Sequence, residues 1–118
     1  MKIRIFLTLI LSIVSIAVSA NSLRIFTLSA DDWARPRAGA VISEITAIRS
    51  AVSYWEKELD SVILIRYPGE DTGEIWATEL RDWLVSLGIP SDYIMLASGN
   101  PAADEINLIV GNRAEIKQ

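Results

Sequence analysis

Three carboxylates gather in the segment that follows Pro68-Gly69, namely Glu70, Asp71 and Glu74. Glu70 and Asp71 could meet an ammonium group or a divalent cation, because carboxylate oxygens suit both. The spacing fits no EF-hand loop and a hard cation takes more oxygen ligands, so we expect no metal and no cofactor. Alternatively, Asp71 caps a helix and Glu74 completes a capping box, which is the interpretation we favour.

A second cluster places an indole beside two guanidinium groups: Trp33, Arg35 and Arg37 surround Pro36. Such a set could hold a carboxylate, a phosphate or a glycan. In the alternative that we favour, Trp33 closes the edge of the core and the arginines pair with nearby carboxylates. Arg66, at the end of an apolar run, could point into a pocket or, as we favour, emerge at a strand end.

The elements that must position these residues follow from the spacing of apolar side chains. We expect strands over 23–28, 62–67, 93–97 and 106–110, and helices over 40–59 and 73–87. The prediction of the first helix depends on six apolar residues that are spaced four and three apart and so lie on one face: Val41, Ile45, Ile48, Val52, Trp55 and Leu59. The order βαβαββ predicts a two-layer α/β sandwich, with a mixed four-stranded sheet and two helices on one face. The last two strands could pair antiparallel.

The second predicted helix has a clear end and an apolar stripe that carries two tryptophans. Gly88 suits a left-handed terminus and Pro90 prevents continuation. Trp76 falls on the stripe and is expected in the core, as is Trp55 in the first helix. Trp83 lies near the edge of the stripe and is the better candidate for exposure. After Gly111 the chain is polar, and we expect it to fray.

The N-terminal twenty residues have the three parts of a secretory signal peptide. Lys2 and Arg4 precede an apolar run over 5–18, which ends at a cleavage site between Ala20 and Asn21. The alternative is an uncleaved anchor, but the run is short for a membrane span of about 20 residues. We therefore expect a signal peptide over 1–20 and one periplasmic domain over 21–118, without a stable membrane anchor.

Composition excludes several functions. The chain has no Cys and no His. This removes lipid anchoring through Cys, disulfides, and the common zinc and Ser-His-Asp or Cys-His sites. Without Lys2 and Arg4, 9 basic residues face 15 acidic ones, a net charge of 9 − 15 = −6. This charge disfavours nucleic-acid binding.

The stretch from Val62 to Ala97 resembles the OmpA/MotB C-terminal family, whose domains share the βαβαββ order. The loop Tyr67-Pro-Gly-Glu-Asp-Thr-Gly73 and the helix end Asp82-Trp-Leu-Val-Ser-Leu-Gly-Ile89 carry the resemblance. The resemblance places Glu70 where the family has a loop Asp. Trp76 stands where the family has an Arg, with Arg81 about one helical turn away. In the family, the Asp and Arg grip a peptidoglycan stem peptide.

We therefore expect a non-enzymatic periplasmic domain that binds an envelope component, with peptidoglycan as one candidate, or an exported protein partner. One alternative is an accessory or assembly subunit of an envelope complex. Another is a small hydrolase that depends on carboxylates.

Overall fold

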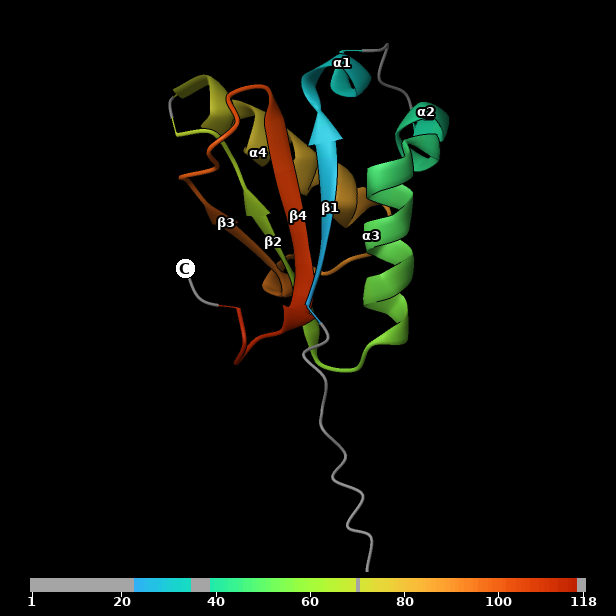
Figure 1. Cartoon of the computed structure of the whole chain (residues 1–118). Coiled ribbons are helices and arrows are strands. Elements are labelled where there is room, and N and C mark those ends of the chain that lie inside the picture. The colour runs from blue at the N-terminus through green and yellow to red at the C-terminus, as the bar shows by residue number, and fades with distance from the viewer. Residues whose placement is uncertain (1–22, 35–38, 70, 117–118) are drawn as a thin grey trace, which may run out of the picture.

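The computed structural model describes residues 23–34, 39–69 and 71–116 (Figure 1). The strands are β1 (Arg24–Ser29), β2 (Ser61–Arg66), β3 (Ile94–Ala97) and β4 (Glu105–Asn112). The helices are α1 (Ala30–Trp33), α2 (Gly39–Glu44), α3 (Thr46–Lys57) and α4 (Asp71–Ser86), with a 3-10 turn, η1 (Ser91–Tyr93), before β3. The α/β class and the βαβαββ order are confirmed. The predicted signal peptide, with Ala20 and Asn21, lies outside the described residues.

The sheet is mixed and has the strand order β1-β4-β2-β3. β2 and β3 are parallel, whereas β4 is antiparallel to both of its neighbours, β1 and β2. The idea that the last two strands pair with each other is therefore wrong. The connection over 98–104 crosses β2, and β4 then enters the centre of the sheet, where Ile106, Leu108 and Val110 become fully buried. Burial of this apolar strand favours the central position over an edge.

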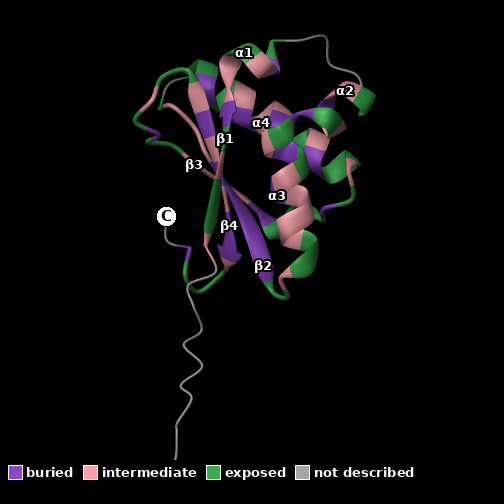
Figure 2. Ribbon diagram, turned by 45° about the vertical axis from the view of Figure 1, so that its right-hand side comes forward, coloured by how far each residue is buried: buried purple, intermediate pink, exposed green. Residues whose placement is uncertain are grey.

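The helices pack on one face of this sheet (Figure 1). Alternate residues of β2, Ile63 and Ile65, point to that face together with Leu108 of β4. They meet Ile48 of α3 and Leu80 of α4, and all five side chains are fully buried. Figure 2 shows the buried residues concentrated on β2 and β4. Burial of this cluster is the main stabilising contribution to so small a domain.

The predicted helix over 40–59 is two helices, separated by a bend at Ile45 with φ −65° and ψ 122°. The bend lets both Ile42 and Ile45 enter the core. α3 then ends at Lys57, because Glu58 takes an extended conformation. Leu59 was expected in the core, but 91% of its surface is exposed. The apolar spacing continued past the point where the helix stops.

The end of α4 follows the prediction closely. Gly88 has φ +111°, and the N–H of Ile89 donates to the carbonyl oxygen of Leu84 at 3.1 Å. This is a Schellman motif, in which buried Ile89 makes the accompanying apolar contact. The expected fraying after Gly111 is wrong, since β4 runs to Asn112 and Ile116 is buried against the outer face of the sheet.

Candidate functional site

The carboxylate loop and Arg81 do not form one site. α4 begins at Asp71 itself, so this residue is inside the helix and not at the cap position that we predicted. Its carboxylate is exposed in the first turn, where its negative charge interacts favourably with the partial positive charge of the helix N-terminus. Arg81 lies ten residues further along, about 15 Å away at 1.5 Å per residue. Its guanidinium is 3.6 Å from the carboxylate of Asp82. Glu70 lies outside the described residues.

Arg66 belongs to a different face of the molecule. Side chains alternate along β2, with Ile63 and Ile65 toward the helices and Leu64 toward the outer face. Arg66, two residues after Leu64, is therefore on the outer face and is half-buried. Its Nε is buried and has no hydrogen-bond partner among the described residues. No hollow that the structure shows is lined by both Arg66 and Asp71 within the described ranges.

The tryptophan cluster is mainly structural. Trp33 is buried and its ring lies 6.4 Å from that of Trp76, so the interpretation that it closes the core edge is confirmed. It is not available as a ligand platform. Arg35 and Arg37 lie outside the described residues. Trp83 is half-buried and packs against the core, as Trp55 and Trp76 do, so its expected greater exposure stays a prediction.

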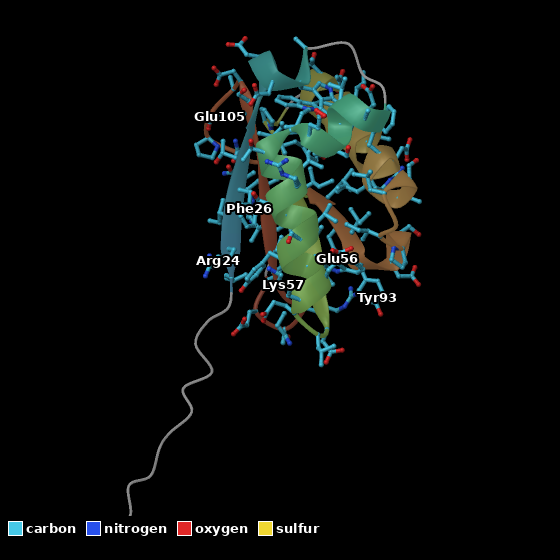
Figure 3. All side chains as sticks on the ribbon, turned by 90° about the vertical axis from the view of Figure 1, so that its right-hand side faces the viewer. Arg24, Phe26, Glu56, Lys57, Tyr93 and Glu105 are labelled. Atoms are coloured by element: carbon cyan, nitrogen blue, oxygen red, sulfur yellow. The ribbon has the colours of Figure 1, made fainter. Side chains whose placement is uncertain are left out.

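Another group of residues lines an open hollow of about 220 Å³ beside the end of α3. We call its lining the acidic aromatic surface. Apart from Ser61 at its base, it consists of Trp55, Glu56, Glu58, Leu59, Asp60 and Tyr93. Figure 3 shows Glu56 and Tyr93 near each other at this end of the domain. Three of the described lining residues are acidic and none is basic.

The strand pairing explains why these residues meet. β2 and β3 are parallel, with Ile63 opposite Ile94, so both strands begin at the same edge of the sheet. α3 returns to that edge before β2 starts, which brings the turn over 58–60 there. Tyr93 is the last residue before β3 and reaches the same place. Its ring meets that of Trp55 edge to face, with centroids 5.8 Å apart.

Hydrogen bonds hold the surface in this form. The indole Nε1 of Trp55 donates to the carbonyl oxygen of Ser61 at 2.8 Å. The Ser61 hydroxyl lies 2.7 Å from the carbonyl oxygen of Glu58 and 3.2 Å from that of Trp55. Asp60, with φ +62°, reverses the chain between them. Because the turn and the indole are tied together, a ligand would meet a preformed surface, which lowers the entropic cost of binding.

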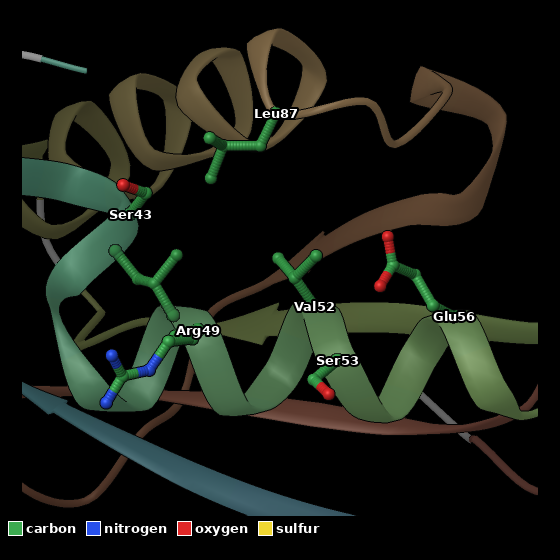
Figure 4. A pocket seen from close by; sticks show the side chains of 7 residues that line it. Ser43, Arg49, Val52, Ser53, Glu56 and Leu87 are labelled. Carbon is green, nitrogen blue, oxygen red and sulfur yellow. The ribbon is translucent and has the colours of Figure 1, made fainter. Parts of the chain in front are cut away.

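A second hollow continues from the first along α3, and Glu56 lines both. It is an open groove of about 200 Å³ between α3 and the end of α4. Figure 4 shows Val52 of α3 opposite Leu87, with Glu56 at one end. The floor is apolar and the rim carries Ser43, Arg49 and Ser53.

The apolar spacing predicts Trp55 and Leu59 in the core and gives no role to the acidic residues between and after them. The signal that was available is the run Glu56-Lys57-Glu58-Leu59-Asp60, in which three carboxylates surround an apolar residue at a helix end. Tyr93 could not have been added, because its position depends on the parallel pairing of β2 and β3.

Comparisons of the chain with family models, with curated proteins and with solved structures find no match. No helix among residues 23–34, 39–69 and 71–116 has the length and apolar character needed to span a membrane.

Proposed function

We propose that this chain is a non-enzymatic binding domain of the periplasm, which recognises a protein partner through the acidic aromatic surface. The observation that carries the proposal is an apolar centre within a charged rim. Leu59 is 91% exposed and Tyr93 38% exposed, next to half-buried Trp55. Aromatic residues in a central position dominate the affinity of protein interfaces, and a polar rim surrounds them.

The setting in the envelope rests on the predicted signal peptide over 1–20. The βαβαββ order agrees with what the resemblance to OmpA-like domains implies, and supports the same setting. A peptidoglycan site at the family's position has less support. Trp76, which stands in the place of the family's Arg, is half-buried against Trp33, whereas Glu70, which stands in the place of the family's Asp, lies outside the described residues.

A comparison of two exposed apolar positions tests the proposal. Leu59→Asp places a charge in the centre of the surface. Ile75→Asp does the same on α4, where Ile75 is 67% exposed in a second acidic hollow that has no aromatic lining residue, so the comparison tests the aromatic surface and not acidity alone. We expect the wild-type chain and Ile75→Asp to retain the same protein from a periplasmic extract, and Leu59→Asp to lose it. Equal retention by both variants contradicts the proposal. Sedimentation of the chain with purified peptidoglycan and no protein partner would replace it with the peptidoglycan hypothesis.

A further inference from the structure

The rim of the acidic aromatic surface has one sign of charge. Glu56, Glu58 and Asp60 line the hollow, and Asp92, next to Tyr93, lines its neighbour. Asp60 and Tyr93 of the acidic aromatic surface also line that neighbouring hollow, where the cationic Arg113 lies as well. Arg113 lines that neighbouring hollow and donates from Nη2 to the backbone oxygen of Asp92 at 2.8 Å, while Lys57 lines a hollow on the other side of α3. The rim therefore attracts a cationic group and repels an anionic one.

The centre of the surface favours a cation that also has an apolar or planar body. Trp55 and Tyr93 meet edge to face, so the contact between them covers only one face of one of the two rings. Of the Tyr93 surface, 38% remains exposed to solvent. An aromatic face attracts a cation placed over it. The chain itself contains this geometry, since the guanidinium of Arg24 lies 5.2 Å from the ring centre of Tyr54.

A bare metal ion suits the surface less well. Within the described ranges, no three carboxylates converge closely enough to hold a metal ion. Carboxylates that are spread around aromatic rings suit an extended cation with several donors. The guanidinium group fits this description, because it is planar, stacks on rings and forms paired hydrogen bonds with carboxylates.

We infer that the acidic aromatic surface binds an arginine side chain in an extended segment of the partner protein. The guanidinium lies against Tyr93 and Trp55 and donates to carboxylates among Glu56, Glu58 and Asp60. The remainder of the segment follows the groove between α3 and α4, where Val52 and Leu87 offer apolar contacts. This inference rests on the proposed function and names the chemistry of that same site.

Two peptides with blocked ends test the chemistry directly. One carries a single arginine between apolar residues, and the other carries citrulline, a neutral group of the same shape, at that position. We expect the arginine peptide to shift the indole N–H signal of Trp55 and the ring signals of Tyr93 in NMR spectra. We expect the citrulline peptide to bind at least tenfold more weakly, and 0.5 M NaCl to weaken the arginine peptide strongly.

Variants then test the contribution of the aromatic rings and that of the acidic rim separately. Tyr93→Phe keeps the aromatic face and should bind the arginine peptide as the wild type does. Tyr93→Leu keeps an apolar side chain without that face and should lower the affinity about fivefold. The triple variant Glu56→Gln, Glu58→Gln, Asp60→Asn should lower it about tenfold. Equal affinity for the two peptides, or no loss in the triple variant, overturns the inference.

These experiments distinguish failure of the arginine inference from failure of the proposed function. Capture of a partner that depends on Leu59, without any preference for arginine over citrulline, would leave the binding surface intact and refute the arginine chemistry. Arginine-specific binding of the peptide by the wild type alone, without partner capture that depends on Leu59, would support the chemistry and contradict the proposed function.

Discussion

At the scale of single residues, the polar group that matters most to the proposed site is Ser61. It is almost fully buried, at 3% exposure, and its hydroxyl joins the end of α3 to the start of β2 through the carbonyl oxygens of Trp55 and Glu58. The indole of Trp55 bonds to the backbone of the same residue. Ser61 thus fixes the ring and the turn that form the surface, although it presents almost nothing to solvent.

Ser61→Ala should lower the free energy of unfolding by about 1 kcal/mol, because the carbonyl oxygen of Glu58 loses the short bond from the hydroxyl and keeps only the Ser61 N–H at 3.4 Å. Denaturant unfolding followed by tryptophan fluorescence measures this change. Ser86→Ala is the matched control, since the Ser86 hydroxyl donates to the carbonyl oxygen of Asp82 on the exposed side of α4. We expect its stability to be unchanged or slightly raised, and an equal loss in both variants would contradict the role of Ser61.

At the scale of elements, the sequence predicted those parts that local rules determine. The Schellman end of α4 needs only Gly88, Ile89 and the preceding helix, and it was found as expected. The bend at Ile45 was missed because apolar residues keep the same spacing through it. The central position of β4 was missed because strand pairing depends on contacts far apart in the sequence.

The candidate site was predicted less well than the fold for the same reason. Asp71 and Arg81 are close enough in sequence to suggest one site, yet α4 separates them along its length. Trp55, Leu59 and Tyr93 meet because two strands start at one edge of the sheet, and no local pattern encodes that pairing.

The junction between β2 and α4 gives a prediction at this scale. A Cβ on Gly73 would overlap the carbonyl oxygen of Pro68, which is backbone and cannot move aside easily. Gly73→Ala should therefore lower the free energy of unfolding by about 2–3 kcal/mol, as overpacking does in a closed site. Gly39→Ala is the control, because a Cβ there meets no atom of the described residues within 4 Å. Thermal unfolding followed by circular dichroism compares them, and a loss in Gly39→Ala as large as in Gly73→Ala would contradict this reading.

At the scale of the whole molecule, the sheet and helices bring the starts of β2 and β3 and the end of α3 to one place. The acidic aromatic surface lies there, with the groove between α3 and α4 leading away from it. The mature chain expected after cleavage at Ala20 carries a net charge of 9 − 15 = −6, which agrees in sign with the rim. A cationic partner would be attracted at a distance as well as in contact.

Photocrosslinking in intact cells tests the central claim most directly, because it tests the compartment and the surface together. A p-benzoylphenylalanine residue replaces Leu59 or, as control, Ile75, which is also exposed but lies on α4. We predict one crosslinked periplasmic protein from position 59 and none from position 75, with the chain in the product starting at Asn21. Crosslinks of equal yield from both positions, or from position 75 alone, would contradict the account.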